Sequence, residues 1–192
     1  TGHEATVANY GGGVPTIHPY LDVGRPIAFA HRGGAEVHPE NTERAFRHAV
    51  DLGFTHLESD VHVTRDGVAI AFHDERLDRV TDTVGVISEM RWAEVRSARV
   101  HGREPILRLE ELFEAFPDSR LNLDPKHSTA VQPLADAILR AGAVERVMVG
   151  SFSDRRIDAV RKLVGPELAV SAGPRQTASI VLRSRGVPTP AK

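Results

Sequence analysis

The chain has 192 residues, of which 41% are hydrophobic and 26% charged, a composition typical of a globular protein rather than a disordered or fibrous one. Its 24 basic and 26 acidic residues give a formal net charge of -2, which argues against a general attraction to nucleic acid or to an anionic membrane. The absence of cysteine excludes disulfides, thiolate metal sites and a cysteine nucleophile, and no apolar run is long enough to span a bilayer. We expect a soluble protein without stable membrane insertion; the compartment stays open between the cytoplasm and secretion after loss of a signal peptide.

Residues 1–24 contain Gly11-Gly12-Gly13 and no apolar periodicity, so they are predicted to form an irregular segment in which the glycines act as a linker. From residue 25 onward, short apolar runs alternate with amphipathic stretches. This pattern is typical of repeated β/α units around a parallel sheet, and it predicts one α/β domain over residues 25–192.

The first predicted strand, residues 27–30, is followed by a helix that begins at Asn41 or Thr42 and ends at Gly53. A strand over residues 56–64 then turns at Asp66-Gly67 into a returning strand. After an excursion over residues 75–106, a helix ends at Pro117. The remaining predicted elements are strands at 120–123, 147–150 and 168–171 and helices at 130–141, 154–163 and from about residue 174.

The strand at 56–64 has apolar residues on one face and Glu58, Asp60 and His62 on the other. A parallel strand covered by helices should be apolar on both faces. Buried carboxylates are costly unless they bind a cation or pair with bases, so this face is interpreted as functional. An edge strand with one solvated face is the alternative.

The hairpin after this strand supports that interpretation. With Asp66 and Gly67 as a two-residue loop, the register pairs Asp60 with His73 and places an imidazole beside the carboxylates. A shift of one residue would remove this agreement. The alternative for His73 is a surface histidine in a loop.

The strand at 120–123 continues into polar residues on one face, among them Asp124 and Lys126. Asp124 would be a third carboxylate beside Glu58 and Asp60, and three carboxylates suit Mg²⁺ or Ca²⁺ better than zinc. Lys126 has two interpretations that spacing does not separate: an ion pair with Asp124, or a cation that neutralises a phosphate.

His31-Arg32-Gly33-Gly34 follows the first strand, at the carboxyl end where β/α sheets place ligand sites. Arg32 offers a planar fork to phosphate oxygens, and the glycines allow a close approach. Two histidines, three carboxylates and two cations together provide the groups needed for metal-assisted hydrolysis of a phosphoester.

Five short motifs in order carry a resemblance to a known family: His31-Arg32-Gly33-Gly34, Pro39-Glu40-Asn41-Thr42, Leu57-Glu58-Ser59-Asp60-Val61, Thr64-Arg65-Asp66-Gly67 and His73-Asp74. Over about residues 26–175 the sequence resembles the glycerophosphodiester phosphodiesterase family. The resemblance implies a TIM-type (β/α) barrel and hydrolysis of small glycerophosphodiesters to glycerol 3-phosphate and an alcohol. Ser151-Phe152 also looks like a family Ser-Phe pair.

The resemblance also implies roles for individual residues. Glu58, Asp60 and Asp124 would hold a divalent cation, Mg²⁺ or Ca²⁺. His31 and His73 would be the general base and general acid, in an order that stays open, and Arg32 and Lys126 would contact the phosphate. The resemblance favours attack by the substrate's own neighbouring hydroxyl, through a cyclic phosphate.

Two departures from the family accompany these expectations. Asp124 stands where the family often has Glu, and the shorter arm could shift the position of the cation. Five of eight barrel strands are counted, so the barrel is expected to be truncated at its C-terminus. The alternatives are an inactive fragment, a non-catalytic binder of phosphate ligands, and a lysophospholipase D with the same site and a more apolar pocket. The oligomeric state is left open.

Overall fold

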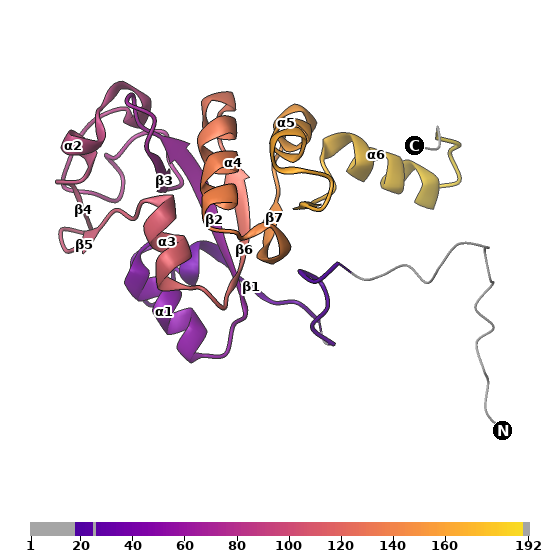
Figure 1. Ribbon diagram of the computed structural model, residues 1–192, viewed down its shortest axis with the longest axis horizontal. Coiled ribbons are helices and arrows are strands. Elements are labelled where there is room, and N and C mark those ends of the chain that lie inside the picture. The colour runs from indigo at the N-terminus through magenta and orange to yellow at the C-terminus, as the bar shows by residue number, and fades with distance from the viewer. Residues whose placement is uncertain (1–17, 25, 190–192) are drawn as a thin grey trace.

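The computed structural model of the protein describes residues 18–24 and 26–189. Five parallel strands form its main sheet in the order β1-β2-β6-β7-β8, and a short β3 pairs antiparallel with β2 (Figure 1). Most of the irregular segment predicted for residues 1–24, including the glycine triplet, lies outside the described residues. The strands are β1 (Phe29–Ala30), β2 (His56–Val63), β3 (Ala69–Ala71), β6 (Arg120–Pro125), β7 (Val147–Val149) and β8 (Ala169–Val170).

The predicted α/β class and its five parallel strands are confirmed. Within the described part of the chain, β1 and β8 are not paired with each other, so these residues form an open sheet rather than a closed barrel. The helices that follow the parallel strands are α1 (Glu43–Asp51), α3 (Leu109–Ala115), α4 (Val131–Arg140), α5 (Asp154–Val164) and α6 (Pro174–Ser184).

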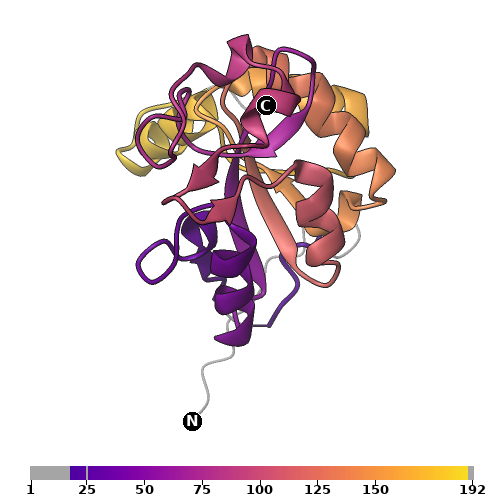
Figure 2. The ribbon, with the colours of Figure 1, turned by 90° about the vertical axis from the view of Figure 1, so that its left-hand side faces the viewer.

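The main hydrophobic core lies between the sheet and helices α1, α3, α4 and α5. Leu57, Leu121 and Val149 from the strands are fully buried with Phe46 of α1 and Leu134 of α4. Helices α4 and α5 lie next to each other, and α6 extends beyond α5 (Figures 1 and 2). None of the residues of α6 is buried. No helix among the described residues is long and apolar enough to cross a membrane.

Strand β2 occupies the middle of the sheet, with β6 along one side and both β1 and β3 along the other. Seven of its eight residues are therefore buried, and only Glu58 is partly exposed. This position excludes the edge-strand alternative. The polar face of β2 consequently lies inside the protein, where its carboxylates require partners.

The predicted hairpin register was wrong by one residue. Val61 pairs with Ala71 and Val63 with Ala69. The amide of Thr64 donates to the carbonyl of Val68, so the loop has three residues rather than two. Its last residue, Gly67, adopts a φ of 86°, which suits glycine. Position 72 rather than 73 consequently lies opposite position 60.

The excursion after β3 has a core of its own, built from residues such as Ile70, Leu77 and Ile87. It contains α2 (Trp92–Val95), β4 (Arg99–Val100) and β5 (Glu104–Pro105), which lie on the far side of β3 from α4 in Figure 1. The Asp66 carboxylate accepts from the backbone amide of Trp92 at 2.9 Å and joins the hairpin loop to this excursion. This bond gives Asp66 a role in the longer turn.

Candidate active site

The predicted site residues of β2 and β6 lie side by side at the carboxyl ends of these strands. In the parallel register, Glu58 is paired with Asn122 and Asp60 with Asp124. All four side chains belong to the polar face of the sheet, opposite the leucines of the main core. Asp60 is the most enclosed, with 3% of its side chain exposed, so its charge depends on nearby cations.

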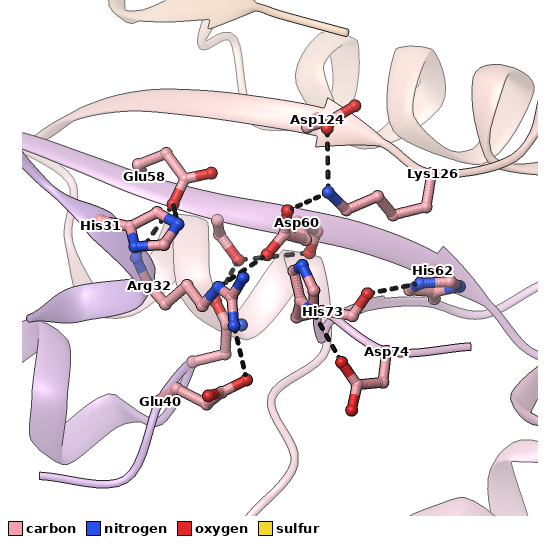
Figure 3. Close-up of polar contacts among 12 residues, drawn as sticks. His31, Arg32, Glu40, Glu58, Asp60, His62, His73, Asp74, Asp124 and Lys126 are labelled. Atoms are coloured by element: carbon pink, nitrogen blue, oxygen red, sulfur yellow. Dashed lines mark hydrogen bonds and ion pairs between the residues drawn. The ribbon is translucent and has the colours of Figure 1, made fainter. Parts of the chain in front are cut away.

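Lys126 supplies one of these cations. Its ammonium lies 2.6 Å from Asp60 Oδ1 and 3.0 Å from Asp124 Oδ2 (Figure 3). Burial disfavours the charged form, but hydrogen bonds to the two carboxylates outweigh it and raise the pKa of Lys126. The ion pair considered for Lys126 and Asp124 is therefore present, and Asp60 shares it.

Arg32 supplies the second cation. Its Nε lies 3.5 Å from Asp60 Oδ2, and its Nη1 donates to Glu40 Oε1 at 3.2 Å. The backbone at Arg32 is left-handed, with a φ of 51°. In this conformation its amide donates to Glu58 Oε2 at 2.9 Å, and its carbonyl accepts from the amide of Asn41. Arg32 thus contacts the site through both its backbone and its side chain.

Glu58 lies between the Arg32 amide and the ring of His31. Burial raises the pKa of Glu58 to about 7; the Arg32 amide opposes this shift, and the neighbouring Asp60 adds to it. His31 Nε2 is 3.9 Å from Glu58 Oε2. With 68% of its side chain exposed, His31 is accessible to a ligand from solvent.

His73 is oriented by two contacts. Its Nδ1 lies 2.6 Å from Asp74 Oδ1, and its carbonyl accepts from His62 Nε2 at 3.0 Å. A hydrogen bond from Arg79 is the main cause that holds the pKa of Asp74 at about 2, so the carboxylate is ionised and Nδ1 donates to it. Nε2 of His73 is left for other contacts. Figure 3 shows the ring on the side of the sheet that carries Asp60 and Arg32, despite the error in register.

Four polar residues beside the site were not among the predicted ones. Glu40 and Asp74 stood in the motifs Pro39-Glu40-Asn41-Thr42 and His73-Asp74, without a role. Arg79 bridges both of them, and no local pattern could indicate this because Glu40 is 39 residues away in sequence. Asn122 was placed on the polar face, but only the register with Glu58 reveals its position.

The oxygen-bearing side chains of the site are of the type that binds a hard divalent cation, but they are not arranged as a complete coordination shell. Among residues 18–24 and 26–189, no group of three or more His, Cys, Asp or Glu side chains is arranged to hold a metal ion. However, three buried side-chain oxygens on the polar face of β2 and β6 make no hydrogen bond: Asp60 Oδ2, Asp124 Oδ1 and Asn122 Oδ1. Carboxylate and amide oxygens of this kind are the ligands that Mg²⁺ and Ca²⁺ prefer.

A pocket of about 740 Å³ adjoins these oxygens. Glu58, Asn122 and Asp124 line its polar end. The predicted Ser151-Phe152 pair also lines it, and Phe152 is 90% exposed. Residues of α6, including Val181 and Leu182, contribute apolar side chains to the lining of the same pocket.

The protein therefore has an α/β fold with an acidic centre at the carboxyl ends of its parallel strands. One arginine, one lysine and two histidines surround this centre. The family model described as Glycerophosphoryl diester phosphodiesterase family matches residues 31–168. The chain belongs to this family. The match includes every predicted site residue, from His31 to Lys126.

Individual relatives agree with this assignment. The chain is 41% identical, over 163 residues, to a protein of Mycobacterium tuberculosis named probable glycerophosphodiester phosphodiesterase 2, with 84% of this chain and 61% of the relative covered. Human lysophospholipase D GDPD1 is 38% identical over 110 residues, which cover 50% of this chain and 35% of that protein.

A solved structure gives the same result for the fold. The crystal structure of the glycerophosphoryl diester phosphodiesterase domain of an uncharacterized M. tuberculosis protein superposes with a TM-score of 0.75 at 26% identity. The superposition covers 83% of this chain and 64% of the solved chain. The chain therefore spans somewhat less than two thirds of the length of the 41% identical relative and of the solved domain.

Proposed function

We propose that the protein hydrolyses glycerophosphodiesters to glycerol 3-phosphate and an alcohol. One observation carries the proposal: the carboxylate of Asp60 lies between two cations, Arg32 at 3.5 Å and Lys126 at 2.6 Å. Cations and carboxylates in one enclosed centre suit a substrate that brings an anionic phosphate together with a metal ion. Membership of the family and the name of the 41% identical relative support the same reaction.

A divalent cation, Mg²⁺ or Ca²⁺, would be held by Glu58, Asp60 and Asp124. The buried oxygens without hydrogen bonds on Asp60 and Asp124 support this choice, and the free amide oxygen of Asn122 makes it a further candidate ligand. When bound, such a cation polarises a phosphoryl oxygen. The shorter side chain of Asp124 still carries a charge and an unpaired oxygen.

Arg32 and Lys126 would bind the phosphate of the substrate and stabilise the charge that develops on its oxygens. Both cations are already held in place by carboxylates, so they need little reorganisation when a phosphate arrives. Neither cation is fully enclosed, with 18% of the Arg32 side chain and 23% of the Lys126 side chain exposed. A ligand can therefore reach them.

His31 and His73 would move the protons. In the view of Figure 3, Arg32 lies between the two rings, which favours a base on one side of the phosphate and an acid on the other. One imidazole would take the proton of the attacking hydroxyl, and the other would protonate the leaving alkoxide. With the substrate's own neighbouring hydroxyl as the attacking group, a cyclic phosphate would form first and water would open it.

The five parallel strands are proposed to correspond to strands of a TIM-type barrel. The solved domain of the same family supports this correspondence, because its superposition covers 83% of the chain. The site residues all come from the segments that follow β1, β2, β3 and β6 or from those strands themselves. The proposed chemistry therefore depends on the described part of the sheet.

The test is release of glycerol 3-phosphate from glycerophosphocholine with Mg²⁺, with Ca²⁺ or with a chelator. The proposal predicts release with a divalent cation and none with the chelator. Chelator-resistant release would contradict the role of the metal. Glycerol 3-phosphate binding without turnover under any condition would instead support a non-catalytic phosphate-binding protein or an inactive fragment.

A lysophospholipase D activity is the second candidate, and the pocket is the observation that favours it. Apolar residues of α6 and the exposed ring of Phe152 line the same pocket as the carboxylates. An apolar wall of this kind could accept an acyl chain. The human relative is named as a lysophospholipase D. Faster cleavage of lysophosphatidylcholine than of glycerophosphocholine would support this candidate, and the reverse order would reject it.

A further inference from the structure

Arg79, in the loop after β3, contacts two carboxylates that come from different parts of the chain. Its Nη1 lies 3.1 Å from Glu40 Oε2 and its Nη2 lies 2.6 Å from Glu40 Oε1. Its Nε donates to Asp74 Oδ2, and Nη2 also lies 3.1 Å from Asp74 Oδ1. The planar fork of one guanidinium therefore holds both carboxylates.

Each of these carboxylates holds a different residue of the proposed reaction. Glu40 accepts from Arg32 Nη1 at 3.2 Å, and Asp74 accepts from His73 Nδ1 at 2.6 Å. A continuous chain of contacts thus runs from Arg32 through Glu40, Arg79 and Asp74 to His73. It joins the segment after β1 to the segment after β3, which are separated in sequence by α1 and β2.

The charges of the residues in this series of contacts agree with its geometry. Burial disfavours the charged form of Glu40, but the bonds from Arg79 outweigh it and hold the pKa of Glu40 below its ordinary value. The pKa of Arg79 is raised in turn, mainly by Glu40 and Asp74. With 48% of its side chain exposed, Arg79 is not needed to fill the core.

We propose that Arg79 is a positioning residue that couples the phosphate-binding Arg32 to the acid–base His73 by holding Glu40 and Asp74 in one guanidinium fork. The inference rests on the proposed function, because it assigns to Arg79 the alignment of two groups that act in that reaction. Arg79 itself touches neither the carboxylates of β2 nor Asp124 in any contact of the described residues.

Loss of the fork should leave both groups present but misaligned. Misplacement by about 1 Å can cost up to about 100-fold in rate, so Arg79→Ala should lower kcat by about tenfold or more. The matched control is Arg76→Ala, in the same loop, because Arg76 is an exposed arginine whose ion pair is to Asp78. It should keep the rate of the wild-type protein.

Chemical rescue separates positioning from a general loss of structure. Millimolar guanidinium should restore several-fold of the activity of Arg79→Ala, because a free guanidinium can bridge the same two carboxylates. Sodium chloride at the same ionic strength should not restore it. Arg79→Lys, which keeps the charge but not the fork, is the second variant and should also be impaired.

A spectroscopic measurement tests the inference without turnover. In ¹⁵N NMR at a pH where the imidazole is neutral, His73 of the wild-type protein should carry its proton on Nδ1, facing Asp74. Arg79→Ala should shift His73 towards the mixture of tautomers of a free imidazole, whereas Arg76→Ala should not. The His73 signals are assigned by their absence in His73→Ala.

The outcomes of these experiments are distinct. Reduced kcat with guanidinium rescue and a changed His73 tautomer supports the inference. Full activity of Arg79→Ala, or reduced activity with no rescue and an unchanged tautomer, overturns it. If the wild-type protein shows no turnover, the proposed function fails, and the tautomer of His73 in Arg79→Ala alone decides the inference: a change supports it and no change overturns it.

Discussion

Replacement of Glu58 by glutamine should remove a large pH dependence from the stability of the protein. Glu58 is 14% exposed, and burial raises its pKa from an ordinary value of 4.5 to about 7. The folded state therefore keeps this proton at pH values where the unfolded chain has lost it. The stabilisation is complete below the ordinary pKa and is lost as the pH rises through about 7.

The size of the effect follows from these two pKa values. Between about pH 5 and about pH 8, proton linkage at Glu58 lowers the free energy of unfolding by about 2.5 kcal/mol. Glutamine does not titrate, so Glu58→Gln should lose this contribution to the pH dependence. The stability of Glu58→Gln relative to the wild-type protein should rise by the same amount over that interval.

The measurement is urea denaturation of both proteins at the two pH values, with a chelator present so that no cation binds the carboxylate. Glu114→Gln is the control, because Glu114 is exposed on α3. Its stability relative to the wild-type protein should change little with pH. A difference between Glu58→Gln and the wild-type protein that is constant from about pH 5 to about pH 8 would refute the reasoning from burial.

Three further changes address the other groups of the site. Lys126→Met should reduce the free energy of unfolding by about 3 kcal/mol, because Asp60, which is only 3% exposed, loses its nearest cation. Urea denaturation measures this change, and a reduction no larger than that of the control Lys162→Met, at an exposed lysine, would contradict the prediction. His73→Ala should lower turnover of glycerophosphocholine by about 100-fold, with His101→Ala as an exposed control, and near-full activity would reject the acid–base role. Asn122→Ala should weaken the binding of the activating divalent cation several-fold if the free oxygen of Asn122 is a ligand, and a metal titration of activity measures this. An unchanged midpoint of the titration would exclude Asn122 from the metal ligands.

The sequence allowed the sheet and the polar faces to be predicted because they depend on local periodicity. Alternation along β6 separates Leu121 and Leu123 from Asn122 and Asp124, and the structure has these faces as expected. The start of α1 could also be predicted from the sequence, because Thr42 is a residue type that caps helices and its hydroxyl accepts from the amide of Ala45. These features are set by neighbours in sequence.

Features that depend on distant contacts could not be predicted. The hairpin loop contains one residue more than its Asp-Gly pair suggested, and Asp66 within it bonds Trp92, which is 26 residues away. The bridge from Arg79 to Glu40 spans 39 residues. To predict that Lys126 contacts both Asp60 and Asp124, one needs the register of β2 against β6. No short sequence motif contains this information.

The most direct test of the account is ³¹P NMR of glycerophosphocholine incubated with the protein and with Asp60→Asn. Asp60 is the group that the two cations share and that would also hold the metal, so the account predicts that the wild-type protein with Mg²⁺ or Ca²⁺ converts the diester signal to that of glycerol 3-phosphate. It predicts no conversion with a chelator and at least about 100-fold slower conversion by Asp60→Asn. No product from the wild-type protein with either metal, or equal rates for the two proteins, would contradict it.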